Sequence, residues 1–211
     1  VKVAEMLGGL IRDIEAQSAA PTIYSGAFKS QVAGAWGAWR VMPEYEDGDT
    51  FDQRLRIKAV PNAMTVYFDE GADPFGRGAM QCLVAERISK EKYKTLFGEK
   101  LAASLSIPRD NRGWITDNEV RIGEYYRMVA EQETLALLSD GRVMPYSRAL
   151  DTEIKALNAA GGSVSIMQKR KATKWFCEWT KIDGANVLEG PIRYPYRQIP
   201  VIRTPGRFVN I

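Results

Sequence analysis

The stretch Arg54-Leu55-Arg56-Ile57-Lys58-Ala59-Val60 alternates basic and apolar side chains almost without interruption. Successive side chains of an extended strand point to opposite faces, so this pattern predicts a strand with one face in water and the other on a core. Pro61-Asn62 then predicts a turn, and residues 64–68 predict another short strand. The acidic and glycine-rich residues 69–78 indicate a loop. This part of the chain therefore indicates a sheet.

Strands and short helices follow one another irregularly in the rest of the chain. Ser89 predicts the N-cap of a helix that runs to Phe97, and a helix over 152–159 is expected to be closed by Gly161-Gly162. Asp140-Gly141 predicts a tight hairpin turn. Further strands are expected over 79–88, 120–129, 187–188 and 201–202, and in a long stretch after residue 162. Residues 135–144 are expected to form a hairpin. Without a regular strand–helix–strand alternation, we expect an α+β fold of mainly antiparallel sheet, with a few short helices and one N-terminal helix.

The N-terminal part of the chain predicts helix. Apolar residues recur at three- and four-residue spacing and stop before Pro21, namely Val3, Met6, Leu7, Leu10, Ile11 and Ile14. Gly8-Gly9 weakens an isolated helix, so we expect it to pack closely on another element. Residues 24–39 predict a second helix, whose small residues permit a close neighbour, namely Ala27, Ala33, Gly34, Ala35, Gly37 and Ala38. We expect a single domain over 1–211, helical over 1–40 and strand-rich over 41–211.

Length and composition are those of a globular protein. The chain has 211 residues, of which 45% are hydrophobic and 26% are charged, close to the averages for folded domains. No apolar stretch approaches the roughly 18 residues that a membrane span needs, and no positively charged start precedes an apolar signal region. We therefore expect an unexported protein with no membrane partner.

The set of reactive side chains is narrow. The sequence contains no histidine, and its only cysteines are Cys82 and Cys177. This composition excludes Ser-His-Asp and Cys-His catalysis, histidine metal centres and a disulfide framework. Two cysteines without histidines also cannot complete a four-ligand zinc site. We expect no enzyme activity, no catalytic or metal-binding residue and no cofactor.

Charge is unevenly distributed, although its total is small. The formal net charge is +3, too low to indicate a protein that grips phosphates by bulk charge. Acidic residues gather at Glu44, Glu46, Asp47, Asp49 and Asp52, and again at Asp69, Glu70 and Asp73. Basic residues gather at Lys169, Arg170, Lys171, Lys174 and Lys181. Solvated faces are the simplest interpretation of these clusters.

A metal-dependent nuclease is one functional alternative. Glu153-Ile154-Lys155, with Asp140 upstream, resembles the carboxylates and lysine of such an enzyme. A helix with Ile154 and Leu157 as its buried edge would instead leave Glu153 and Lys155 on a solvated surface, which is the interpretation we favour. The loop over 71–78 lacks the Gly-Lys-Ser/Thr ending of a phosphate-binding loop and precedes a strand.

A small nucleic-acid-binding module is the other alternative. The stretch from Lys169 to Trp179 interleaves basic and aromatic residues, which single-strand binders use to neutralise phosphates and to stack on bases. Sheet architecture explains the same stretch, because alternation places Trp175, Cys177 and Trp179 on one face. We interpret these tryptophans as core or subunit interface.

Short motifs in a fixed order carry a family resemblance. They are Gly9-Leu10-Ile11-Arg12-Asp13-Ile14-Glu15, Gln81-Cys82-Leu83-Val84-Ala85-Glu86-Arg87-Ile88-Ser89 with Tyr93 and Phe97-Gly98, Val120-Arg121-Ile122-Gly123-Glu124-Tyr125-Tyr126, Leu138-Ser139-Asp140-Gly141, Leu188-Glu189-Gly190-Pro191 and Ile199-Pro200-Val201-Ile202. In this order and spacing, the chain resembles the portal proteins of short-tailed phages of the P-twenty-two type over nearly its whole length.

The resemblance implies a structural role. It identifies the chain with the wing, the peripheral α+β part of a portal subunit, and the stem, clip and crown of that family would be absent from it. It implies a ring of twelve subunits at the capsid vertex, through which double-stranded DNA is packaged and ejected. Capsid protein, the terminase motor and tail factors are then partners, in the virion and, during assembly, in the host cytoplasm.

A closed ring requires one face of each subunit to meet a different face of its neighbour. Opposite charges on these faces would favour the contact. We therefore expect two sets of residues to be subunit-contact or DNA-facing, namely Glu44, Glu46, Asp47 and Asp49 on the acidic side and Lys169, Arg170, Lys171 and Lys174 on the basic side.

Overall fold

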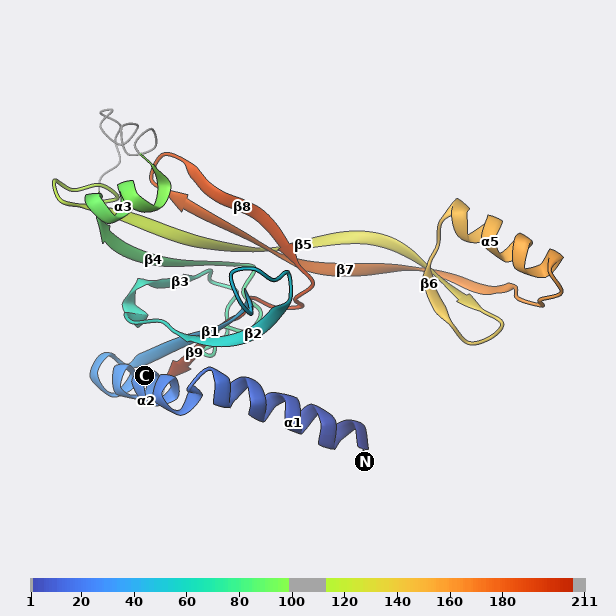
Figure 1. Ribbon diagram of the computed structural model, residues 1–211, viewed down its shortest axis with the longest axis horizontal. Helices are drawn as coiled ribbons and strands as arrows, with labels where there is room; N and C mark the ends of the chain where they lie inside the picture. The colour runs from blue at the N-terminus through green and yellow to red at the C-terminus, as the bar shows by residue number, and fades with distance from the viewer. Residues whose placement is uncertain (1, 99–112, 207–211) are drawn as a thin grey trace. The chain divides into compact units, whose positions relative to one another are not determined.

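The computed structural model describes residues 2–98 and 113–206. The sequence after Gly98 also predicts a polar linker through Pro108 to Gly113, which lies, except for Gly113, outside the described residues. Contacts within the chain cluster into two compact units (Figure 1). Unit 1 lies within Val1–Met128 and Cys177–Ile211, and unit 2 is Val129–Phe176. Whether both belong to one domain over 1–211 stays a prediction.

Unit 1 begins with two helices, α1 (Lys2–Gln17) and α2 (Ala20–Gly34), and carries a third, α3 (Lys90–Phe97). The first helix ends before Pro21, as predicted. The second was placed too late in the sequence, because Pro21 lies in its first turn, where a missing N–H costs no hydrogen bond. It ends at Gly34 since Ala35 takes a positive φ of 69° and leads directly into a strand. Among the described residues, no helix is long and apolar enough to cross a membrane.

The strands of the described residues form two sheets. The smaller has the order β2-β1-β9, and the larger has the order β3-β4-β5-β7-β8 with β6 on β5. Their bounds are β1 Trp36–Tyr45, β2 Gln53–Ala59, β3 Val66–Phe68, β4 Gln81–Ser89, β5 Glu119–Leu138, β6 Val143–Pro145, β7 Ile166–Asp183, β8 Val187–Tyr194 and β9 Val201–Pro205. The pairs β1–β2, β1–β9, β3–β4, β4–β5, β5–β6 and β7–β8 are antiparallel. The predicted α+β class with mainly antiparallel sheet is confirmed.

The smaller sheet, with β1 at its centre, lies between α2 and the larger sheet in unit 1. The odd-numbered residues of β1 face α2, where Trp39 contacts Tyr24 edge to face with ring centroids 5.1 Å apart. The even-numbered residues of β1 face the larger sheet, and Ala38 lies in a buried cluster with Cys82, Tyr126, Trp179 and Val201. The small residues predicted to allow close approach do so, but α2 approaches a strand and not another helix. Figure 1 shows α2 alongside the three-stranded sheet.

Strand β2 confirms the alternation over residues 54–60 only in part. Ile57 is buried, whereas Leu55, expected on the same core face, is 41% exposed. Leu55 pairs with Pro43, towards the turn of the β1–β2 hairpin, and Ile57 pairs with Val41, closer to the core. The hairpin therefore extends beyond the core it starts from.

A second apolar cluster attaches α3 to the larger sheet. Tyr93 on α3 packs with Ile88, Val120 and Ile122, and its hydroxyl donates a hydrogen bond to the Asp183 carboxylate. The predicted cap is confirmed, since the Ser89 hydroxyl accepts the Lys92 amide at 3.2 Å. These contacts place α3 on the face of the larger sheet that also carries Val84 and Glu124.

Unit 2 contains the end of β5, β6, the start of β7 and α5 (Arg148–Ala159). The predicted hairpin is confirmed, with Leu137 opposite Val143 and Gly141 at a φ of 85°. The helix starts four residues earlier than predicted because Ser147 caps it, accepting the Leu150 amide. It ends as predicted, with Gly162 N–H donating to Leu157 O and Gly161 N–H to Asn158 O.

The buried edge of α5 differs from the prediction. Ile154 is buried with Leu150, Ala136 and Leu138, but Leu157 is 49% exposed. Leu150 takes the place expected for Leu157, because it lies one turn before Ile154 on the same face of the helix. The cluster that holds unit 2 together is therefore built around Leu150 and Ile154 of α5.

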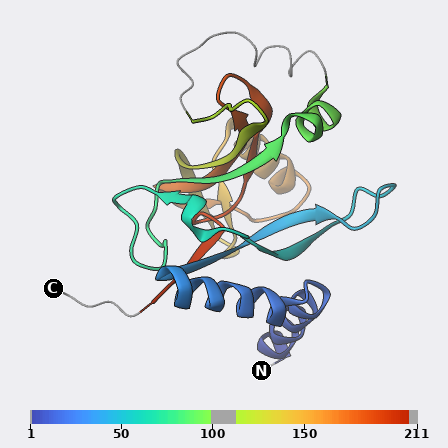
Figure 2. The same ribbon diagram turned by 90° about the vertical axis from the view of Figure 1, so that its left-hand side faces the viewer.

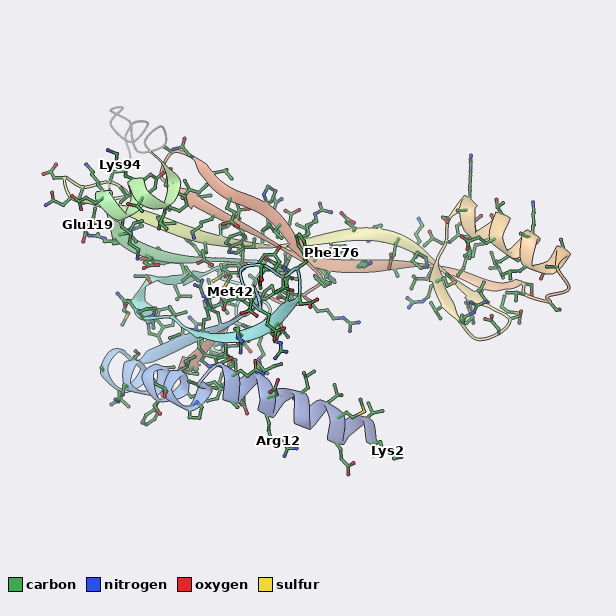
Figure 3. The ribbon with its side chains drawn as sticks, in the orientation of Figure 1. Lys2, Arg12, Met42, Lys94, Glu119 and Phe176 are labelled. Carbon is green, nitrogen blue, oxygen red and sulfur yellow. The ribbon has the colours of Figure 1, made fainter. Side chains whose placement is uncertain are left out.

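The expected close packing of Gly8-Gly9 on another element is wrong for the described residues. A side chain built on Gly9 would meet no atom within 4 Å, and α1 buries none of its residues. Its apolar face is exposed at Val3, Met6, Leu7, Leu10 and Ile11. Figure 3 shows the side chains of this helix, with Lys2 and Arg12 labelled, extending away from its axis.

The contact between α2 and β1 gives a test of the packing. A Cβ added to Gly37 would lie 2.0 Å from the Ala27 carbonyl oxygen, so Gly37→Ala forces α2 away from β1. We expect a loss of about 2 kcal/mol in the free energy of unfolding, the usual cost of overpacking. Urea unfolding measures it.

Gly26→Ala is the matched control for this substitution. Gly26 lies inside α2, and a Cβ there meets nothing within 4 Å. Alanine has the higher helix propensity, so this variant should be more stable by about 0.5–1 kcal/mol. Equal stability of Gly37→Ala and the unsubstituted chain would contradict the packing described.

Candidate subunit-contact surfaces

The acidic residues Glu44, Glu46, Asp47 and Asp49 lie in and beside the turn of the β1–β2 hairpin. Glu44 forms an ion pair with Lys58 across the ladder, and Glu46 Oε1 lies 2.6 Å from Arg54 Nη2. Both glutamates are therefore matched by basic residues of their own hairpin. Asp47 and Asp49 are exposed in the turn, which Figure 2 shows standing clear of the strands that carry it.

The turn also holds an aromatic residue that sequence reasoning missed. The side chain of Phe51 is 94% exposed between Asp49 and Asp52. The signal was present, since a phenylalanine in an acidic stretch without apolar alternation has no core face to join. We call residues 46–52 the hairpin tip. It combines negative charge with one large apolar side chain.

The basic residues Lys169, Arg170, Lys171 and Lys174 lie on β7 in unit 2, and all four are exposed. Alternation along the strand places Lys169 and Lys171 on one face and Arg170 and Lys174 on the other. Two of them lie over aromatic rings. The Lys169 ammonium is 3.4 Å from the Tyr146 ring centroid. The Lys174 ammonium is 5.1 Å from the Phe176 ring centroid. The basic stretch is thus a ribbon charged on both faces.

The tryptophans of β7 have different environments. Trp179 is buried in the core of unit 1, as interpreted, and Cys177 beside it is fully buried. Trp175 is 39% exposed, so it is not a core residue. Trp175 belongs to unit 2, because β7 enters unit 1 only at Cys177.

The residues of the nuclease alternative do not converge. Glu153 and Lys155 are exposed on α5, which confirms the predicted solvated surface. Asp140 is bound by Arg142, whose Nε lies 2.7 Å from Asp140 Oδ2. Over residues 2–98 and 113–206, no three His, Cys, Asp or Glu side chains group so as to hold a metal ion. The loop over 71–78 is organised by Asp73, which accepts the Phe75 and Arg77 amides.

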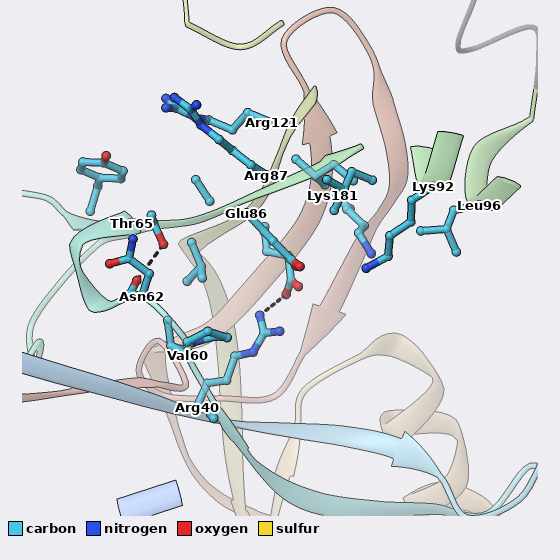
Figure 4. A pocket seen from close by; sticks show the side chains of 18 residues that line it. Arg40, Val60, Asn62, Thr65, Glu86, Arg87, Lys92, Leu96, Arg121 and Lys181 are labelled. Atoms are coloured by element: carbon cyan, nitrogen blue, oxygen red, sulfur yellow. Dashed lines mark hydrogen bonds and ion pairs between the residues drawn. The ribbon is translucent and has the colours of Figure 1, made fainter. Parts of the chain in front are cut away.

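A cavity of about 350 Å³ opens in unit 1 between the smaller sheet and α3 (Figure 4). Its wall contains buried apolar residues of β4 and β5 and of the segment after β2, namely Val60, Val84, Ile88 and Ile122. Leu96, exposed on α3, lies at its mouth. Sequence reasoning missed this cavity, because its walls come from segments far apart in the chain.

An ion pair lies at one side of the cavity. Arg40 Nη1 on β1 is 2.6 Å from Glu124 Oε2 on β5, and the same oxygen accepts Trp179 Nε1 at 3.0 Å and the Tyr126 hydroxyl at 3.1 Å. Burial by itself raises the pKa of the Glu124 carboxyl. The charge of Arg40 and the three hydrogen bonds outweigh it and hold that pKa below its ordinary value of 4.5. Glu124 is therefore a largely buried carboxylate, held by three donors on one oxygen.

Basic side chains predominate around the rest of the cavity. Lys92, Lys181, Arg87 and Arg121 line it, together with Glu86. In Figure 4, the amino groups of Lys92 and Lys181 point towards the same region of the cavity, whereas Arg87 and Arg121 extend side by side, away from Arg40. Arg87 lies directly opposite Arg121 in the β4–β5 ladder, and its guanidinium is 3.5 Å from the Glu119 carboxylate. By alternation, both arginine side chains leave the sheet on the face away from Val84 and Glu124.

A model of the phage P22-like portal protein family matches residues 1–211, which is the whole chain. The chain belongs to this family. Portal proteins are structural proteins of the virion, located at the capsid vertex and associated with DNA packaging. Three of the motifs that carry the resemblance lie in the framework of unit 1 of this portal protein, since residues 81–89 are β4, residues 120–126 lie in β5 and residues 201–202 begin β9.

The ion pair between Arg40 and Glu124 makes the stability of this portal protein depend on pH. Because the folded pKa of Glu124 lies below 4.5, its contribution is present above the unfolded value and is lost as the pH falls through the folded value. Glu124→Gln keeps the size and a hydrogen-bond acceptor but removes the titration. We expect urea unfolding between pH 3 and 5, measured at steps of about half a unit, to show a shallower loss of stability in Glu124→Gln.

Glu86→Gln is the matched control, since Glu86 is an exposed glutamate that lines the same cavity. It should leave the slope close to that of the unsubstituted chain. If Glu124→Gln and Glu86→Gln had the same slope, Glu124 would not be held as described.

Proposed function

We propose that this chain acts as the wing part of a portal ring subunit, in a conduit through which DNA enters the capsid and leaves it. The match of the family model to residues 1–211 carries this proposal. In this role the ring docks the terminase motor and the tail, has twelve subunits and assembles in the host cytoplasm before it joins the virion. The absence of histidine and the dispersed carboxylates support a role through shape and contacts, without catalysis.

Neighbour contacts in such a ring are heterologous, so two different surfaces of the subunit are needed. The hairpin tip and the basic stretch of β7 are suitable surfaces, because both are exposed and charged and neither contributes to a core. We place the subunit contacts at Asp47 and Asp49 on the tip and at Lys169, Arg170, Lys171 and Lys174 on β7. Glu44 and Glu46 contribute less, since Lys58 and Arg54 already match their charge.

Ring formation by the intact portal subunit tests the function. Native mass spectrometry of the purified protein should give one closed assembly with the mass of twelve subunits. Cryo-electron microscopy of the same sample should show a central channel. A protein that stays monomeric at all concentrations, or that forms open filaments, would contradict the proposal.

The basic stretch can be tested separately by charge reversal. Lys171→Glu combined with Lys174→Glu places like charges against an acidic neighbour, so we expect the concentration for half-maximal assembly to rise by about tenfold. Analytical ultracentrifugation measures it at several salt concentrations, and the difference should shrink as salt screens the contact. Lys155→Glu, an exposed lysine on α5 of the same unit, should leave assembly unchanged. Unchanged assembly of the double variant would remove β7 from the contact.

A further inference from the structure

The β1–β2 hairpin is an arm that starts beside the cavity of unit 1 and leads away from it. Arg40 and Ala59, near the base of the hairpin, line the cavity. From there, the ladder runs through consecutive antiparallel pairs from Trp39–Ala59 to Tyr45–Gln53. At about 3.4 Å per residue, the tip lies about 20 Å beyond Arg40. A continuous ladder cannot fold back on itself, so the tip does not reach the cavity of its own chain.

The hairpin tip has the features of an inserting segment. Phe51 is a rigid aromatic side chain held almost wholly in water, and aromatic side chains of this kind are the usual anchors of protein interfaces. Asp47, Asp49 and Asp52 surround it with negative charge. The turn itself is ordered by hydrogen bonds, from Glu46 N to Asp52 O and from Asp52 N to the Thr50 hydroxyl. An ordered tip loses little conformational entropy on binding.

The cavity has the complementary features. Its buried wall of valine and isoleucine suits an aromatic ring, and its volume of about 350 Å³ exceeds what one phenyl ring needs. Of the basic side chains around it, Lys92 and Lys181 point into it, and they outnumber Glu86, the one lining carboxylate that Arg40 does not hold. An acidic segment with an aromatic centre therefore matches both the charge and the polarity of this site.

We propose that the hairpin tip of one subunit inserts Phe51 into the cavity between β4 and α3 of a second copy of this chain. Asp47 and Asp49 then lie against Lys92 and Lys181 at the mouth. The donor and receptor surfaces are different parts of the same unit, so the contact is heterologous and repeats from subunit to subunit, as a closed ring requires. This inference rests on the proposed function, because it names the receptor of the hairpin tip in that ring. The tip then meets the cavity and not the basic stretch of β7, which would contact the neighbour elsewhere.

Disulfide trapping in assembled rings tests the insertion. Gly48→Cys introduces a thiol at the tip, where a side chain meets nothing within 4 Å, and Leu96→Cys introduces one at the mouth of the cavity. Cys82 and Cys177 do not compete, since burial raises the pKa of each thiol to about 12 and leaves almost no thiolate. Mild oxidation of the double variant should give a ladder of covalent oligomers on a denaturing, non-reducing gel.

Controls separate the inference from the function it rests on. Gly48→Cys with Val32→Cys, an exposed position on α2 outside the cavity, should give no ladder. Rings that form but give only monomers, internally linked chains or dimers would overturn the insertion and leave the ring intact. A protein that forms no ring even without substitutions would overturn the proposed function itself.

Two further variants test the chemistry of the contact. Phe51→Ala should raise the concentration for half-maximal assembly by about tenfold or more, whereas Phe28→Ala, an exposed phenylalanine on α2, should not. Asp49→Lys should reduce the ladder, and Lys92→Glu in the same chain should restore it, because the pair is then reversed and still opposite in charge. A ladder that Asp49→Lys leaves unchanged would exclude this pairing, and failure of Lys92→Glu to rescue a reduced ladder would count against it.

Discussion

The ion pair between Arg40 and Glu124 joins the two sheets of unit 1. Arg40 comes from the centre of the three-stranded sheet and Glu124 from the centre of the larger one, and a single carboxylate oxygen accepts from Arg40, Trp179 and Tyr126. The apolar cluster around Ala38 and Trp179 provides burial, but apolar contacts are not directional. The ion pair adds a direction, since a buried carboxylate is tolerated only where its donors are in place. It thereby fixes how β1 crosses β5.

This crossing determines what unit 1 presents to other molecules. The β1–β2 hairpin leaves the body along the direction of β1, and the cavity between β4 and α3 is bounded by Arg40 itself. Because one ion pair holds both the hairpin and the cavity, their positions relative to each other are constant. Constancy matters in a closed ring, because an angular error at each neighbour contact accumulates around the circle. A rigid body with two unlike surfaces is therefore well suited to a portal subunit.

Local features of the sequence predicted the local structure well. Ser89, Asp140-Gly141 and Gly161-Gly162 act through hydrogen bonds to residues a few positions away, and each occupies its predicted place. Errors arose where a distant contact decided the outcome. The strand predicted over 120–129 was not extended through residues 130–138, because Glu131, Gln132 and Glu133 do not alternate with apolar residues. In the structure these three residues lie in the part of β5 that belongs to unit 2. Periodicity assigned Leu157 to the buried edge of a helix, although neighbouring elements do not cover it. Trp175 was interpreted as core or subunit interface, and its exposure excludes only the core.

The candidate site was less accessible to sequence reasoning than the fold. The charges of the hairpin were found, but their partial neutralisation by Arg54 and Lys58 depends on a register that only the ladder fixes. Arg40 and Glu124 lie 84 positions apart, and no spacing rule connects them. The cavity likewise exists only where β2, β4 and α3 meet. The sequence could not predict this site because the site depends on contacts between residues far apart in the chain. The types of the residues involved were not the obstacle.

A double-mutant cycle on Arg40 and Glu124 measures the central contact directly. Arg40→Met, Glu124→Gln and the combined variant are compared with the unsubstituted chain by urea unfolding. If the pair joins the two sheets as described, the combined variant should lose about 2 kcal/mol less than the two single losses together, because neither partner then remains buried alone. Losses that add to within about 0.5 kcal/mol would show that the two residues act independently and would contradict the account.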